Sequence, residues 1–352
     1  MNDNIKYLID LLYENNSLKL SEYENLVKGY SAVTAEYVAQ KADSVRKSIY
    51  GNKVYIRGLI EISNICKNNC LYCGIRKGNK LCSRYRLSKE EILDCCDVGY
   101  NLGFRTFVMQ GGEDLYYTDE VMCKIIREIK LRYDDCAITL SLGERSYESY
   151  KNMFEAGADR YLLRHETADP EHYGRLHPSE MSFQNRMKCL RELREIGYQV
   201  GCGFMVGSPY QTSLTIAKDL KFIEEFKPDM CGIGPFIPHN ATPFKYEKPG
   251  DVRFTCFLLS IIRLIHPNIL LPATTALGTL SKNGREKGIL AGGNVVMPNL
   301  SPMSVRGKYE LYNNKAYTNL ESAQCKRELV KEMEKIGYRI VVDRGDIANI
   351  SC

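Results

Sequence analysis

Three cysteines in one short stretch are the residues of this chain whose spacing is best suited to chemistry. Cys66, Cys70 and Cys73 are separated by three and then two residues. A structural zinc site needs a fourth ligand and is usually built from Cys-x2-Cys pairs, whereas here only Cys82 follows nearby. A cubane iron–sulfur cluster is commonly held by four cysteines. Three cysteines would leave one iron open to a small molecule.

The elements that must position these cysteines are alternating strands and helices. Beyond residue 53, short apolar runs alternate with longer amphipathic segments. The apolar runs, read as strands, are Val54–Ile62, Thr106–Met109, Ala137–Leu142, Tyr161–Arg164, Val200–Val206, Met230–Ile237, Ile269–Thr275 and Val295–Met297. The segments with helical periodicity lie near 88–103, 118–132, 147–157, 182–197, 212–226, 251–266 and 282–291.

This alternation predicts parallel strands joined by crossover helices. Eight units of about 30 residues favour an α/β fold of the closed (β/α)8 TIM-barrel type over a doubly wound open sheet. We therefore expect a helical extension over 1–50, a barrel over 51–312 and a short helical tail over 313–352. Residues 1–50 contain apolar residues at helical spacing, among them Ile5, Leu8 and Leu12.

In such a barrel the C-terminal ends of the strands build the active site. Several predicted strands end in residues of functional type. These are Gln110–Glu113, Ser141–Glu144, Arg164–Glu166, Thr274–Thr275 and Pro298–Asn299. Charge at the end of an apolar strand must be paired or bind a ligand, so we expect these residues to converge near the three cysteines.

The cysteine stretch, with Tyr72 before its last cysteine, resembles the C-x3-C-x-aromatic-C motif of the radical SAM superfamily. This resemblance implies a [4Fe–4S] cluster on Cys66, Cys70 and Cys73. The methionine amino and carboxylate groups of S-adenosylmethionine (SAM) would chelate the open iron. An electron from the reduced cluster would then break the S–C5′ bond and release a 5′-deoxyadenosyl radical.

Longer strings distributed over residues 50–315 look like the radical SAM maturases of [FeFe]-hydrogenase. They include Arg164-His-Glu-Thr167, Ile233-Gly-Pro-Phe-Ile-Pro-His239 and Asn294-Val-Val-Met-Pro-Asn299. The resemblance implies SAM contacts at Tyr72, Gln110, Gly111, Gly112, Glu113, Thr139, Ser141, Glu166, Arg186, Met205 and Ile233. It implies a substrate cavity lined by Arg160, Arg164, Met230, Thr274, Thr275, Met297, Tyr309 and Tyr312.

The implied substrate is an iron–cysteine complex that carries CO and cyanide, made by a partner maturase and converted toward the diiron precursor of the hydrogenase site. Other hydrogenase maturases and a reductant protein would be partners. Two alternatives remain open. One is another radical SAM enzyme acting on a small amino-acid-like substrate, resembling methylornithine synthase or biotin synthase. The other is a non-enzymatic iron–sulfur carrier, which would have no use for SAM-binding residues.

Some members of this family carry a second cluster on a C-x7-C-x2-C pattern near the C-terminus. The matching positions here are Tyr317, Cys325 and Glu328. Only one of the three ligands is present, so the sequence predicts one [4Fe–4S] cluster, SAM and no second cluster, with 313–352 a degenerate form of that region.

The composition excludes several other classes of protein. The chain has 352 residues and 14 cysteines, about half the cysteine content of a disulfide-dense secreted domain, which exceeds about 8%. It has neither a signal-peptide pattern at its start nor an apolar run long enough to span a membrane. The formal net charge is only +5, from 48 basic and 43 acidic residues, without a basic run typical of nucleic-acid binding. We expect a cytoplasmic protein of an anaerobic cell, bound to neither membrane nor nucleic acid.

Overall fold

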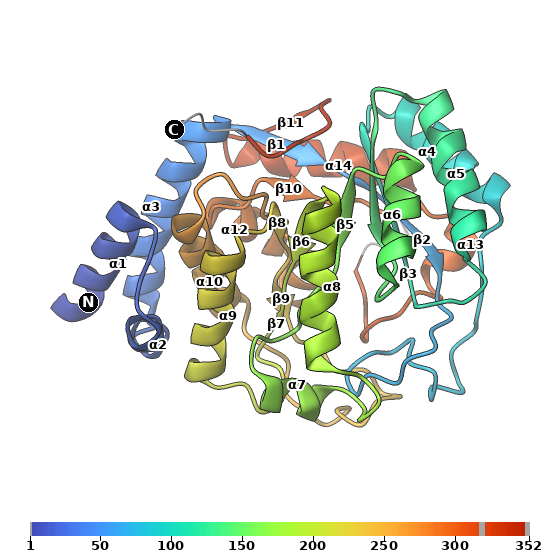
Figure 1. The fold of residues 1–352 in the computed structure, drawn as a ribbon. Coiled ribbons are helices and arrows are strands. Elements are labelled where there is room, and N and C mark those ends of the chain that lie inside the picture. Colours follow the sequence, from blue (N-terminus) through green and yellow to red (C-terminus); the bar gives the residue numbers. More distant parts are fainter. Residues whose placement is uncertain (1, 317–320, 349–352) are drawn as a thin grey trace.

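The computed structural model describes residues 2–316 and 321–348, and it begins with three helices (Figure 1). These are α1 (Asp3–Asn15), α2 (Leu20–Lys28) and α3 (Ala32–Tyr50). Helix α3 packs on α10 (Val252–Ile265), and α2 packs on α9 (Ser213–Phe226). Their apolar faces share one hydrophobic core with the rest of the chain. The extension is helical, as the sequence predicts.

Six parallel strands follow one another in chain order and form the central sheet. They are β2 (Gly58–Ser63), β3 (Thr106–Gly111), β4 (Ala137–Ser141), β5 (Arg160–Leu162), β6 (Gln199–Cys202) and β8 (Met230–Cys231). Helices on their outer side connect them: α4 (Lys89–Asn101), α5 (Asp119–Arg132), α6 (Tyr147–Glu155), α7 (Pro170–Leu176), α8 (Phe183–Ile196) and α9 (Figure 1). The predicted alternation of parallel strands and crossover helices is confirmed.

Single parallel bridges extend this order beyond β8. Met230 pairs with Leu270, and Pro272 pairs with Val295 at the start of β10 (Val295–Val296). Leu59 of β2 pairs in turn with Asn299, with the Leu59 N–H donating to the Pro298 carbonyl at 2.9 Å. The order of pairing thus returns to β2 as in a TIM-type barrel, although this last part consists of bridges rather than continuous strands.

The strand limits differ from the sequence prediction where the backbone bends. The run Val54–Ile62 is two strands, because Arg57 separates β1 (Lys53–Ile56) from β2. Likewise Gly203, at φ +154°, separates β6 from β7 (Met205–Val206). The run Met230–Ile237 divides into β8 and β9 (Gly234–Pro235), and β7 pairs with β9. Periodicity of burial alone does not reveal such breaks, since residues on both sides of each remain buried.

The last part of the chain, from residue 275 onward, carries five of the described elements besides β10. They are α11 (Thr275–Leu280), α12 (Gly284–Leu290), α13 (Met303–Arg306), α14 (Ser322–Lys335) and β11 (Arg339–Val341). The tail is helical over α14, but it also adds β11, which pairs in parallel with β1. The C-terminal segment therefore lies against the end of the barrel at which the strands begin (Figure 1).

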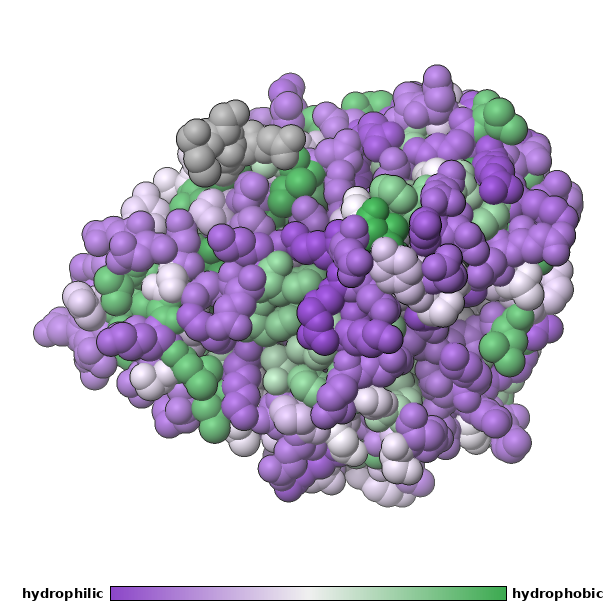
Figure 2. Space-filling model, in the orientation of Figure 1, coloured by the Kyte–Doolittle hydropathy of each residue, from purple (hydrophilic) through white to green (hydrophobic). Residues whose placement is uncertain are grey.

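The face of the molecule drawn in Figure 2 is mostly hydrophilic, and its apolar residues form small separate patches. Among the described residues no helix is both long and apolar enough to cross a membrane.

Candidate active site

The three cysteines lie in the loop that follows β2, at the C-terminal end of the strand. Nδ2 of Asn64 fixes the base of this loop by donating to the carbonyls of Ser83 and Lys308 at 2.8 and 2.7 Å. All three cysteines are free thiols and half-buried. Burial raises the pKa of all three, that of Cys73 to about 12. Such thiols stay protonated near neutral pH unless a bound metal ion displaces the proton.

The Gly-Gly-Glu element at the end of β3 lies directly against the cysteine loop. The Gly112 N–H donates to the Ser63 carbonyl at 3.0 Å. A Cβ atom on Gly112 would lie 2.2 Å from the Ile65 carbonyl oxygen and 2.8 Å from Cβ of Cys66, so only glycine fits here. The side chain of Glu113 accepts from the Glu144 N–H and pairs with Lys67, both at 3.0 Å.

The end of β5 presents an arginine and a glutamate to the same space. Glu166 has φ +65°, uncommon for a residue with a side chain, and its N–H donates to the Gly203 carbonyl at 3.0 Å. Its Oε2 is 3.3 Å from Nη2 of Arg164, yet neither atom, nor Nε of Arg164, has a hydrogen-bond partner within the described residues. The neighbouring His165 is fully buried, and its Nε2 lies 3.4 Å from Oδ1 of Asp219, which is also fully buried. Strain and unsatisfied polar atoms together indicate a ligand site.

Arg186 on α8 is buried and forms hydrogen bonds within the protein. It donates from Nε to Glu144 at 2.6 Å and from Nη1 to the Arg164 carbonyl at 2.7 Å. Burial alone would lower its pKa, but Tyr173 and Glu144 raise it. It therefore stays charged, and its remaining N–H groups are available at the cavity wall.

One cavity of about 340 Å³ connects these features at the C-terminal ends of the strands. It brings together most of the site residues expected from the sequence: Cys66, Cys70, Tyr72, Cys73, Gln110, Gly111, Gly112, Glu113, Ser141, Arg164, Glu166, Arg186, Met205, Thr274, Thr275, Met297, Tyr309 and Tyr312. Four of the five strand ends expected to converge thus contribute to this cavity, whereas Pro298 and Asn299 do not line it.

Four expected site residues do not line this cavity. Ile233 is fully buried between β8 and β9. Thr139, Arg160 and Met230 line a separate cavity of about 10 Å³ near the other end of the barrel. Arg160 and Met230 are the first residues of β5 and β8, whereas Arg164 lies beyond the end of β5.

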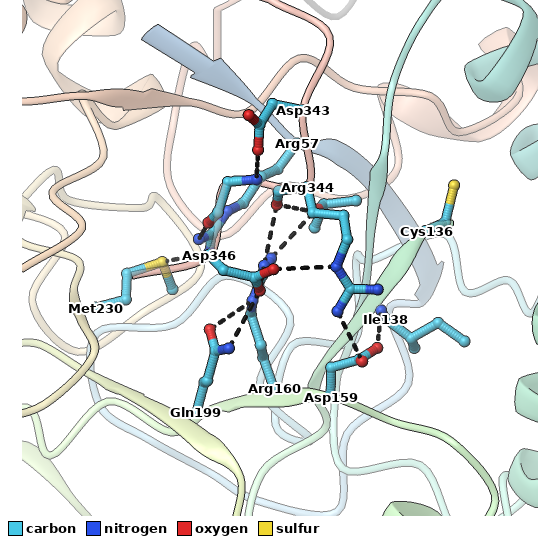
Figure 3. A network of polar contacts seen from close by, with 12 residues as sticks. Arg57, Cys136, Ile138, Asp159, Arg160, Gln199, Met230, Asp343, Arg344 and Asp346 are labelled. Atoms are coloured by element: carbon cyan, nitrogen blue, oxygen red, sulfur yellow. Dashed lines mark hydrogen bonds and ion pairs between the residues drawn. The ribbon is translucent and has the colours of Figure 1, made fainter. Parts of the chain in front are cut away.

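The carboxylate that contacts Arg160 comes from the C-terminal segment. Figure 3 shows Asp346 between Arg160 and Arg344, with Gln199 close by. Arg160 forms an ion pair with Asp346 and also donates to the Arg344 carbonyl at 3.0 Å. This arginine is thus part of a structural network at the end of the barrel remote from the cysteines.

The sequence analysis did not single out Met181, Glu61 or Lys315 of the main cavity wall, and it named Glu144 only as part of a strand end. Met181 lies with its sulfur 3.6 Å from that of Cys70. Glu144 holds Arg186, and Glu61 and Lys315 form a buried ion pair. Glu61 had a detectable signal, because it is the only acidic residue in the apolar run Val54–Ile62. Lys315 had none.

These residues fit both groups that the sequence motif implies. Three free thiols in one loop would supply three cluster ligands and leave a fourth position open, and Gly112 allows close approach to that loop. Unsatisfied atoms of Arg164, Glu166 and Thr274 point to a polar ligand beside it. The fold and the site therefore suit an α/β-barrel enzyme that would hold an iron–sulfur cluster beside a small polar cofactor.

Comparison with known proteins supports this class of enzyme. Residues 60–223 match the family described as the radical SAM superfamily. The chain is 45% identical over 310 residues to the [FeFe] hydrogenase maturase subunit HydE of Thermotoga maritima, covering 88% of each chain. The chain therefore belongs to the radical SAM superfamily, and it is a radical SAM enzyme. Membership implies a [4Fe–4S] cluster and SAM.

The methylornithine synthases are more distant relatives than this HydE. The 3-methylornithine synthase of Methanosarcina acetivorans is 32% identical over 281 residues, or 79% of this chain and 76% of that one. Among solved structures, methylornithine synthase (PylB) superposes with a TM-score of 0.83 at 26% identity, covering 95% and 97% of the two chains. The hydrogenase maturase HydG superposes with a TM-score of 0.80 at 19% identity, covering 97% and 76%, which shows a common fold.

Proposed function

We propose that this enzyme acts in maturation of the [FeFe]-hydrogenase active site, on an iron–cysteine complex that carries CO and cyanide. The observation that carries the proposal is the 45% identity to HydE over 88% of both chains, against 32% to a methylornithine synthase. The higher sequence identity to HydE favours a maturase over an amino-acid mutase of the same superfamily.

Residues of one side of the cavity bind SAM in this proposal. A cluster held by Cys66, Cys70 and Cys73 would supply the electron for reductive cleavage of SAM. Glu113 and the backbone of Gly111 and Gly112 receive the methionine amino group, and Arg186 holds the methionine carboxylate. Glu166 receives the ribose hydroxyls, consistent with its buried and unsatisfied Oε2.

The substrate occupies the other part of the cavity, toward Thr274, Thr275, Met297 and Tyr312. The Oγ of Thr274 is buried without a hydrogen-bond partner among the described residues, as is Nε of Arg164. A cation and a hydroxyl suit an anionic metal complex. Arg160 and Met230 are not included in this substrate site, because they line the remote cavity.

The reductant docks on the cysteine loop in this proposal. Residues 62–89 contain seven basic residues and no acidic one. Lys67, Arg86 and Lys89 form ion pairs with acidic residues outside the segment, which leaves four. The Lys77 N–H donates to the Asn68 carbonyl inside the cysteine loop at 2.8 Å, which places this lysine directly beside the loop. Lys77 and Lys80 are exposed, and so is the apolar Leu81. An acidic one-electron carrier protein fits such a surface.

The one-cluster prediction also remains part of the proposal. Cys325 is buried on α14, whereas Glu328 is exposed. Tyr317 lies outside the described residues. We expect about four irons per chain, the content of one cubane, and an oxygen-poor cytoplasm as the setting for an enzyme with so many free thiols.

The decisive experiment is anaerobic maturation in vitro. The enzyme, SAM, a reductant and the synthetic iron–cysteine complex are combined with the other maturases and apo-hydrogenase, and H₂ evolution is measured. Cys70→Ala provides the inactive control. We expect H₂ evolution with the wild type only. Formation of 3-methylornithine from an amino-acid substrate without hydrogenase activation would overturn the proposal in favour of the mutase.

A further inference from the structure

A buried ion pair lies in the wall of the main cavity, and neither of its two residues has been assigned a role above. Glu61 on β2 is 1% exposed, and Lys315 on the segment after α13 is 8% exposed. Their side chains form an ion pair, and both residues line the cavity. Tyr309 and Gln110, joined by a hydrogen bond of 3.2 Å, line the cavity as well.

The two charged groups are held rigidly. Oε2 of Glu61 accepts from Nδ2 of Asn299 at 2.8 Å, and the Glu61 backbone N–H donates to the Ser301 hydroxyl at 2.8 Å. The Lys315 ammonium also donates to the Tyr309 carbonyl at 3.0 Å, and it lies 4.9 Å from the centre of the Tyr309 ring. Within the described residues the ammonium has only these two acceptors, so one of its three N–H groups remains for a ligand.

Stability alone does not account for this pair. Removing two charges from water costs several kcal/mol per ion, and apolar residues of similar volume often stabilise a protein as well or better. The pair is moreover at the surface of a ligand cavity rather than inside the packed core. A fixed cation next to a fixed anion has no net charge, so it favours a ligand that is itself a zwitterion over a simple anion.

We propose that Glu61 and Lys315 form a subsite for the head group of an α-amino acid. Lys315 binds the carboxylate and Glu61 receives the ammonium group, while Arg164 and Thr274 remain for the negatively charged part of the substrate. This inference deepens the proposed function, on which it rests: the cysteine of the iron complex enters the cavity with its amino and carboxylate groups toward β2.

Three thioether probes test the two halves of this subsite one at a time. None of them has a free thiol that could bind the cluster. S-methyl-L-cysteine carries both groups, 2-(methylthio)ethylamine only the ammonium and 3-(methylthio)propionate only the carboxylate. Binding to the cluster-loaded, SAM-bound enzyme is measured by calorimetry, and by ligand NMR for weak binders. The variants are Lys315→Met, Glu61→Gln and the double variant. The double variant removes both charges together and so avoids an unpaired buried charge.

We expect the wild type to bind S-methyl-L-cysteine at least tenfold more tightly than either single-group probe. Lys315→Met should weaken the two carboxylate-containing probes about 10- to 100-fold and should not weaken the amine, because Glu61 then lacks its competing cation. Lys315→Arg should restore part of this loss. The double variant should fold normally and bind all three probes with similar weakness. A double variant that still prefers S-methyl-L-cysteine as the wild type does would overturn the inference.

The two proposals fail in different ways. If the wild type prefers the zwitterion but does not activate hydrogenase, the subsite stands and the proposed function fails. If the wild type activates hydrogenase and the double variant does so with the same half-saturating concentration of iron–cysteine complex, the proposed function stands and the subsite fails.

Discussion

A single methyl group at Gly112 should displace the cysteine loop. In Gly112→Ala the new Cβ would lie 2.2 Å from the Ile65 carbonyl oxygen. Real contacts of this kind are at least 3.0–3.4 Å, so the backbone next to Cys66 must move by about 1 Å. Overpacking of this kind costs about 1–3 kcal/mol. When this cost falls on the conformation of the loop that binds the cluster, cluster affinity should decrease by about 5- to 150-fold.

Gly111→Ala is the matched control. A Cβ there would lie 3.3 Å from both Cγ1 of Ile62 and the Ser63 carbonyl, which needs an adjustment of only tenths of an ångström. Both variants are reconstituted anaerobically under limiting iron and sulfide, and iron per chain and absorbance near 400 nm are measured. We expect Gly111→Ala to retain nearly the wild-type iron content and Gly112→Ala to lose most of it. Equal iron contents in the two variants would refute the packing argument.

Three further predictions concern the charged groups at the two ends of the barrel. Asp346→Asn should lower the free energy of unfolding by about 1–3 kcal/mol in urea titrations, because it leaves the buried Arg160 without its carboxylate. Burial alone would raise the pKa of Asp346, but Arg160 and Arg344 lower it to about 2 from the usual 3.8. The contribution of this pair should therefore be complete above pH 3.8 and disappear as the pH falls toward 2, and Asp346→Asn should lack that part of the acid transition. Arg160→Met should destabilise the protein without changing half-saturation by the iron–cysteine complex, whereas Arg164→Met should weaken that half-saturation about tenfold or more with little loss of stability.

Much of the fold follows from the sequence because the signals are local. Eight apolar runs separated by amphipathic segments leave few topologies, and the observed parallel order follows. The cysteine loop was found for the same reason, since three ligands lie within eight residues. The breaks at Arg57 and Gly203 were not predicted. At Gly203 the cause is a contact distant in sequence, because a Cβ there would lie 2.1 Å from the Gly232 carbonyl oxygen.

The cavity wall was less predictable because its members come from distant parts of the chain. Glu61 and Lys315 are 254 residues apart and become partners only when the segment after the barrel folds back over β2. The acidic residue was visible as an anomaly in an apolar strand. Nothing in the sequence distinguishes Lys315 from the other lysines, because its significance depends entirely on burial.

Position along a strand, more than residue type, separates the residues that maintain the barrel from those proposed to do its chemistry. Arg160 and Arg164 are four residues apart, about 13 Å along an extended chain. The first begins β5 and pairs with the C-terminal segment, and the second follows the strand and faces the main cavity. In a parallel barrel the end where strands begin contributes to stability and the other end to catalysis. The substrate cavity that the family resemblance implies therefore combines residues of two separate cavities, and counting from the ends of each strand distinguishes them.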